Sequence, residues 1–205
     1  MERCAELKTG TFSILALSSD SKLMGVGVAS GSISVGDRVP HAKPGVGVIA
    51  TQAHTNVVYG INGLELLAES LSPKNVLDRL LYADSGRELR QVAIMDFKRR
   101  KAFFTGASVP DWHGEATGES YVVIGNLLAG ENVVPSIGEE FERTSGELAW
   151  RIVSALKAGS EAGGDRRGEK SAALIVVDRR KVKVKMKVDE YENPVEELIR
   201  RLTLI

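Results

Sequence analysis

The sequence has 205 residues, no formal net charge and 43% hydrophobic residues, which is enough apolar side chain for the core of one domain. The balanced charge and an aromatic content of only 5% argue against a nucleic-acid partner, and no apolar run reaches membrane-spanning length. A single cysteine, Cys4, excludes an internal disulfide and a cysteine metal cluster, and without a signal-peptide core it indicates the cytoplasm. The scarcity of glutamine among many Lys, Arg and Glu residues is typical of a thermophile's protein.

The first half of the chain is predicted to contain three strands followed by two helices. Apolar runs bounded by polar turns predict strands over Thr11–Leu17, Leu23–Ser30 and Val46–Thr51. Leucines at helical spacing predict a helix over Asn62–Leu71. Ser72 then supplies an N-cap and Pro73 a first helical residue, so a second helix is expected to follow directly.

The second half is predicted to contain five strands and two helices. The strands are expected over Gln91–Phe97, Lys101–Thr105, Ser120–Leu127, Ser171–Val177 and Val182–Val188. Ser145 and Asn193 are expected to cap the helices. Lysines alternate with apolar residues in the last strand, which is typical of a protected sheet edge. The glycine-rich segment Ala158–Gly168 has no apolar periodicity and is predicted to be a loop of about ten residues.

This order of elements favours an α+β fold. Strand hairpins that alternate with helix pairs do not suit a doubly wound parallel sheet, in which strands and helices alternate singly. Two stacked, mainly antiparallel sheets with helices outside fit the order better. We therefore predict a single domain over residues 11–205, preceded by an N-terminal extension or propeptide over residues 1–10.

Thr11 follows Gly10 and opens the first apolar strand, which makes it a candidate N-terminal nucleophile. A threonine at a mature N-terminus needs no separate base, because its own α-amine accepts the hydroxyl proton. The reference pKa of that amine, roughly 8, lets it act near neutral pH. This chemistry requires the removal of residues 1–10. The alternative is that Thr11 is an ordinary β-branched strand residue.

Several segments occur together, in order, between Thr11 and Asp178. They are Thr11–Ile14, Gly25–Ser30, Gly45–Ala53, Gly63–Leu67, Arg90–Ala93, Gly125–Gly130 and Gly163–Gly168. In these segments the chain resembles the domain of unknown function 1028 family, which is grouped with the N-terminal nucleophile (Ntn) hydrolases. The resemblance implies a four-layer αββα sandwich and hydrolysis of an amide bond in an unidentified small-molecule substrate, without cofactor or metal. Sandwiches of this kind often associate, so we expect a homo-oligomer.

In typical members of that family the threonine directly follows the initiator methionine. Here nine further residues stand between Met1 and Thr11. One hypothesis is that the chain cuts itself at Gly10–Thr11, as proteasome β-subunits do, or starts nearer Thr11. The other is that the extension is permanent and the sandwich is a non-catalytic binding or assembly module.

Three residues are candidates to assist the nucleophile or hold its substrate. Lys43 is a candidate to lower the pKa of the Thr11 amine or steady a developing anion, although a solvated loop lysine is the simpler explanation. Ser30 ends the second strand, where proteasome-like sequences carry an acidic residue. Asn126, at the end of an apolar strand, is either an oxyanion donor or a structural cap.

Polar residues after the third strand and in the glycine-rich loop complete the candidate site. Gln52 and Asn56 are candidate oxyanion donors, and His54 is a candidate acid or base. Asp165, Arg166 and Arg167 either bind an anionic substrate end or brace their loop, and Ser171 is a candidate to position the Thr11 amine. The three histidines are scattered and lack metal-ligand spacing, so no metal site is predicted.

Overall fold

The structure is a computed structural model that describes residues 10–204. The strands are β1 (Thr11–Leu17), β2 (Met24–Ser30), β3 (Pro40–Lys43), β4 (Gly47–Ala53), β5 (Arg90–Asp96), β6 (Lys101–Thr105), β7 (Gly114–Thr117), β8 (Tyr121–Asn126), β9 (Ser171–Val177) and β10 (Val182–Val188). The α-helices are α1 (Val57–Ala68), α2 (Pro73–Tyr82), α3 (Val133–Arg143), α4 (Leu148–Glu161) and α5 (Pro194–Leu202). Of the predicted extension, only Gly10 lies among the described residues.

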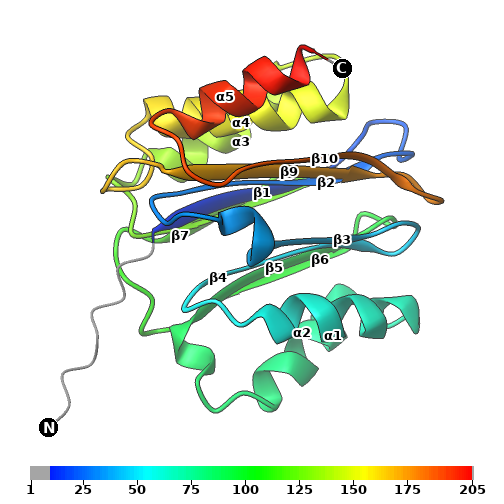
Figure 1. The fold of residues 1–205 in the computed structure, drawn as a ribbon. Coiled ribbons are helices and arrows are strands. Elements are labelled where there is room, and N and C mark those ends of the chain that lie inside the picture. Colours follow the sequence, from blue (N-terminus) through cyan, green and yellow to red (C-terminus); the bar gives the residue numbers. More distant parts are fainter. Residues whose placement is uncertain (1–9, 205) are drawn as a thin grey trace, which may run out of the picture.

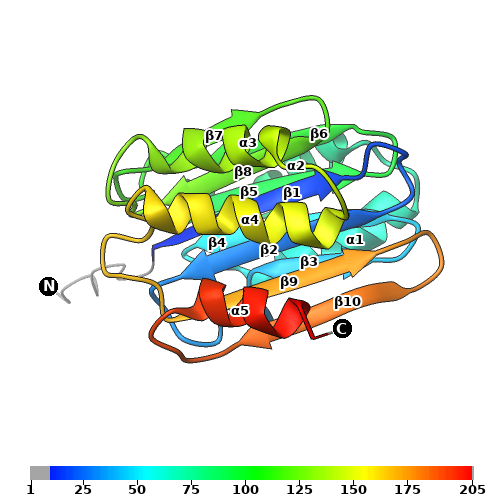
Figure 2. The same cartoon turned by 90° about the horizontal axis from the view of Figure 1, so that it is seen from above.

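Ten strands form two antiparallel sheets that lie face to face (Figure 1). The larger sheet has the order β10-β9-β2-β1-β8-β7, and the smaller has the order β3-β4-β5-β6. Helices α3, α4 and α5 cover the outer face of the larger sheet, and α1 and α2 cover the smaller one. From above, α3 lies over β7 and β8, while α4 crosses β1 and β2 (Figure 2). The predicted four-layer αββα sandwich is confirmed.

Strand alternation divides the side chains of β1 between two cores. Leu15 and Leu17 belong to the apolar core between the sheets, whereas Phe12 and Ile14 pack under the outer helices. Thr11 shares the parity of Leu15 and therefore faces the space between the sheets. This parity places the candidate nucleophile at one end of the inter-sheet core.

Several predicted boundaries are wrong, with consequences for the site. Helix α1 begins at Val57 rather than at Asn62, because the Asn56 side chain caps it by accepting from the Val58 amide. Strand β4 runs on to Ala53, so Gln52 belongs to the strand instead of following it.

The helix caps and the predicted loop also differ from expectation. Ser145 caps no helix, since α4 begins at Leu148 with Glu147 at the N-cap position. Asn193 is the N-cap residue of α5, but its side chain makes no capping hydrogen bond. The first four residues of the predicted loop, Ala158–Glu161, form the last turn of α4, which buries Gly159 against Ile137.

Two short strands and one helix were not predicted. Strands β3 and β7 have four residues each, too few to show an alternating pattern. Helix α3 contains Pro135 and Gly138, which both count against a helix in a sequence pattern. Pro135 lies in the first turn, where a proline is tolerated. Gly138 is required because a Cβ there would lie 2.7 Å from the Tyr121 hydroxyl.

The last strand, β10, is a sheet edge as predicted. Its lysines are exposed, and Val188 is buried against the helix layer. Among residues 10–204 no helix has both the length and the apolar character that crossing a bilayer requires.

Asp84 makes the stability of the smaller sheet's helix layer dependent on pH. Arg90 Nε lies 2.8 Å and the Tyr59 hydroxyl 3.0 Å from Asp84 Oδ2. The hydrogen bond from Arg90, the largest influence, holds the pKa of Asp84 well below its usual range. Because the pKa is lower in the folded state, Asp84 stabilises the fold above about pH 4 and loses this contribution as the pH falls. We expect Asp84→Asn to flatten the acid side of the urea-midpoint profile; an unchanged acid slope would contradict this assignment.

Candidate active site

Four hydroxyl and amide side chains form a row across the larger sheet. Thr11 of β1 pairs with Ser30 of β2 on one side and with Asn126 of β8 on the other, and Ser30 pairs with Ser171 of β9. All four are buried, and by strand parity all four face the smaller sheet. The structure thus brings together four of the predicted site residues.

The smaller sheet contributes two glutamines to the same end of the sandwich. Gln52 of β4 and Gln91 of β5 pair directly and are fully buried, with the apolar residues of their strands lying farther inside. A polar layer therefore closes this end of the inter-sheet core.

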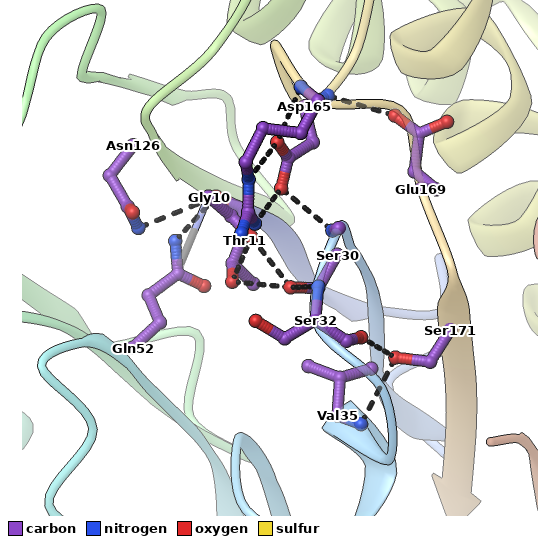
Figure 3. Close-up of polar contacts among 12 residues, drawn as sticks. Gly10, Thr11, Ser30, Ser32, Val35, Gln52, Asn126, Asp165, Glu169 and Ser171 are labelled. Atoms are coloured by element: carbon purple, nitrogen blue, oxygen red, sulfur yellow. Dashed lines mark hydrogen bonds and ion pairs between the residues drawn. The ribbon is translucent and has the colours of Figure 1, made fainter. Parts of the chain in front are cut away.

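The Thr11 hydroxyl lies beside the carbonyl of the residue before it. Thr11 Oγ1 donates to Gly10 O at 2.6 Å, and Ser30 Oγ donates to the same oxygen at 2.6 Å (Figure 3). The two hydroxyl oxygens are 3.0 Å apart. The nucleophile candidate, its neighbouring hydroxyl and the carbonyl of the Gly10–Thr11 bond therefore form one compact triangle.

The three amide side chains of the polar layer direct their hydrogens at protein acceptors. Gln52 Nε2 donates to Thr11 O at 3.1 Å and to Gln91 Oε1 at 2.8 Å. Asn126 Nδ2 donates to Gln91 Oε1 at 3.1 Å and to Thr11 O at 3.4 Å. Gln91 Nε2 donates to Gly125 O at 2.9 Å. In this state the amides hold the Thr11 backbone in place, and their predicted role as oxyanion donors stays a prediction.

Asp165 belongs to the glycine-rich loop and lies next to Gly10. Its carboxylate accepts from the Gly31 amide at 2.6 Å and from Arg167 Nη2 at 2.8 Å, and its side chain is fully buried. Its own amide donates to Glu169 Oε1 at 2.8 Å, and burial raises the pKa of Glu169. The Asp165–Arg167 pair thus braces the loop, which was one of the two predicted alternatives.

The Ser171 hydroxyl forms its hydrogen bonds with the turn after β2 and not with Thr11. Its hydroxyl donates to Ser32 O and accepts from the Val35 amide, so it anchors the turn after β2. No contact with Thr11 is formed, although the two residues lie in the same row.

The remaining candidates do not converge on Thr11. Lys43 is exposed and pairs with Gly47 of β4. Gly47 lies five residues from Gln52 along this strand, which corresponds to about 17 Å at the usual strand rise. His54 is exposed, with its Nδ1 2.7 Å from Arg90 Nη1. Asn56 caps α1, and Arg166 donates from Nη2 to Asp111 O at 3.0 Å. Within residues 10–204 no three His, Cys, Asp or Glu side chains gather as a metal site.

A family model described as "Family of unknown function (DUF1028)" matches residues 11–198. The chain belongs to this family. A solved structure of the DUF1028 protein SPO2555 from Silicibacter pomeroyi is 30% identical, with a TM-score of 0.88 over 95% of this chain and 88% of that chain. Anbu (ancestral beta-subunit) from Yersinia bercovieri is 10% identical, with a TM-score of 0.45 over 95% of this chain and 93% of that chain. The search of curated proteins found no match.

The DUF1028 match begins at Thr11, so Gly10 stands immediately outside it while the whole polar layer lies inside it. Ser13, which is buried and donates to Gln52 Oε1 at 2.6 Å, was not predicted as a site residue, and neither was Gln91. A detectable signal existed: the chain has only two glutamines, and Gln91 has the parity of the buried Ala93 and Met95.

Asn126→Asp tests the bracing role of the amide layer. The substitution keeps the shape of the side chain but removes two donors and places a charge beside Thr11 O and Gln91 Oε1. We expect the free energy of unfolding to fall by about 1–3 kcal/mol, measured by urea denaturation. Asn132→Asp, an exposed change at the start of α3, is the control and should stay within about 0.5 kcal/mol. Equal effects at the two positions would contradict the bracing role.

Proposed function

We propose that this DUF1028 protein is an Ntn-type amidohydrolase that cleaves a small amide or peptide-like bond. Thr11 is the nucleophile, and it becomes N-terminal when the chain cuts itself between Gly10 and Thr11. The observation that carries the proposal is the contact of Thr11 Oγ1 with Gly10 O at 2.6 Å in a buried site.

The mature site supplies both nucleophile and base from one residue. The free α-amine of Thr11 takes the hydroxyl proton while Oγ1 attacks the substrate carbonyl. The proton passes to the leaving amine, and an acyl ester remains on Oγ1. Water then hydrolyses this ester and regenerates the Thr11 hydroxyl. Neither a metal nor a cofactor is needed for these steps.

The side chains around Thr11 support its role as nucleophile because they fix the position of its backbone. Gln52 and Asn126 hold its carbonyl oxygen, so the start of β1 stays fixed when the chain in front of it is released. Fixed geometry of this kind is what an N-terminal nucleophile requires, since its hydroxyl and amine must both face the substrate.

The uncut chain keeps the site closed. Thr11 is only 3% exposed, and Gly10 is buried against it. We infer that the uncut protein is an inactive precursor and that removal of Gly10 opens the space in front of the hydroxyl.

Covalent labelling tests the proposal. The chain is produced with Thr11 as its first residue and incubated with a β-lactone, which acylates an activated hydroxyl. We expect one adduct, located on Thr11 by peptide mass spectrometry, and none in the Thr11→Ala chain. Absence of an adduct would contradict the proposal and favour the non-catalytic binding module.

A further inference from the structure

Two side chains limit what can stand at Gly10: Ser30 binds its carbonyl oxygen, and Asp165 occupies the space that a Cβ would need. Ser30 Oγ donates to the carbonyl oxygen at 2.6 Å, beside the Thr11 hydroxyl, which donates to the same oxygen. Asp165 leaves no room for a branch on the α-carbon: a Cβ at Gly10 would lie 2.5 Å from Asp165 Oδ2 and 2.8 Å from Oδ1. Figure 3 shows Ser30 and Asp165 close to Gly10.

Asp165 has little freedom to make room. The Gly31 amide holds its Oδ2 at 2.6 Å, and Arg167 binds Oδ1 through Nε at 3.1 Å and Oδ2 through Nη2 at 2.8 Å. Its side chain is fully buried, so displacement would leave a charge without its partners. A branch on the α-carbon at Gly10 is therefore excluded by a fixed group rather than by a flexible one.

We propose that Ser30 and Asp165 form an acyl subsite, which takes a carbonyl group whose α-carbon carries no branch. Gly10 occupies this subsite before self-cleavage, and the acyl part of the substrate occupies it in the mature protein. The substrate class is therefore an amide of a glycyl or straight-chain acyl group. This inference rests on the proposed function of Thr11.

In self-cleavage and in substrate hydrolysis, the acyl group becomes bonded to the same atom, Thr11 Oγ1. Thr11 Oγ1 adds to the Gly10 carbonyl carbon, and the C–N bond breaks as the hydroxyl proton moves to the Thr11 nitrogen. The product is an ester of Gly10 on Oγ1, which water hydrolyses to a carboxylate and the free hydroxyl. A substrate forms an ester on the same oxygen, so its acyl carbonyl returns to the position that Gly10 occupied.

Ser30 acts on the carbonyl oxygen in both reactions. Negative charge develops on that oxygen as Oγ1 attacks, and a hydrogen bond to it strengthens in the transition state. Ser145 provides a control, because it is exposed between α3 and α4 and lies outside the candidate site.

A time course of self-cleavage tests the subsite. The chain from Met1 is made by cell-free synthesis as wild type, Gly10→Ala, Ser30→Ala and Ser145→Ala, and intact mass is followed after synthesis is stopped. We expect Gly10→Ala to slow cleavage about 10- to 100-fold through steric strain, and Ser30→Ala about 100-fold. Ser145→Ala is expected to cleave at the wild-type rate.

The outcomes separate this inference from the proposed function. Wild type that is never cut overturns the proposed function itself. Wild type that is cut, with Gly10→Ala and Ser30→Ala cut equally fast, overturns only the subsite. Circular dichroism melting verifies the fold of each variant, and Ser30→Ala decides the question if Gly10→Ala does not fold.

The substrate class has its own measurement. The chain that begins at Thr11 is given the 4-nitroanilides of propionic acid and of isobutyric acid, which differ by one branch at the α-carbon. We expect release of nitroaniline from the propionyl compound to be at least about tenfold faster. Equal release, or release from neither, would overturn the extension of the subsite to substrates.

Discussion

Thr11→Ala is expected to leave the chain from Met1 uncut and to abolish hydrolysis, while the fold remains. The substitution removes the atom that attacks both the Gly10 carbonyl and the substrate, so both rates should fall by at least about 1000-fold. The loss of packing is small, because the side chain shrinks by a methyl and a hydroxyl at the end of a strand. Intact mass and circular dichroism measure the two effects separately.

Thr11→Ser is the matched control for that variant. Serine keeps the hydroxyl and loses only the methyl group, so it should retain self-cleavage and hydrolysis at a reduced rate. If Thr11→Ala were cut as readily as wild type, some other residue or a protease would be responsible, and the assignment of the nucleophile would be wrong.

Asp165→Ala is expected to produce the largest loss of stability among the site variants. The carboxylate is fully buried and joins Gly31 of the β2 end to Arg167 of the glycine-rich loop. Removing it leaves the guanidinium and a buried amide without their partner, which costs about 3–5 kcal/mol in comparable pairs. Urea denaturation at neutral pH gives this value as a change in the free energy of unfolding.

Glu119→Ala controls for the loss of an ordinary ion pair. Glu119 pairs with Arg99, but its side chain is 84% exposed, so the expected change is below about 1 kcal/mol. Similar losses for Asp165→Ala and Glu119→Ala would contradict the view that Asp165 is a fixed structural group beside Gly10.

The sequence predicted most of the fold because its signals are local. β9 and β10 occur over the predicted residues, since a continuous apolar run and a lysine-alternating run are visible without tertiary information. Helix α3 was missed because the reasons for Pro135 and Gly138 lie in helix position and in the packing of Tyr121.

The candidate site was predictable only in part. The row of Thr11, Ser30, Asn126 and Ser171 follows from four strands that each end or begin in a polar residue, but its alignment depends on strand register. Lys43 was proposed because it precedes the third predicted strand closely, yet the antiparallel pairing of β3 with β4 carries it to the opposite end. The contact of Asp165 with Gly10 joins segments 155 residues apart, and no pattern in the sequence encodes it.

The most direct test of the central claim is the intact mass and the N-terminal residue of the natively folded protein expressed from Met1. We predict a chain that begins at Thr11, with residues 1–10 lost, and the same cut in purified protein without added protease. A chain that still begins at or near Met1 after prolonged incubation in the folded state would contradict it, because Thr11 would then have no free amine to act as its base.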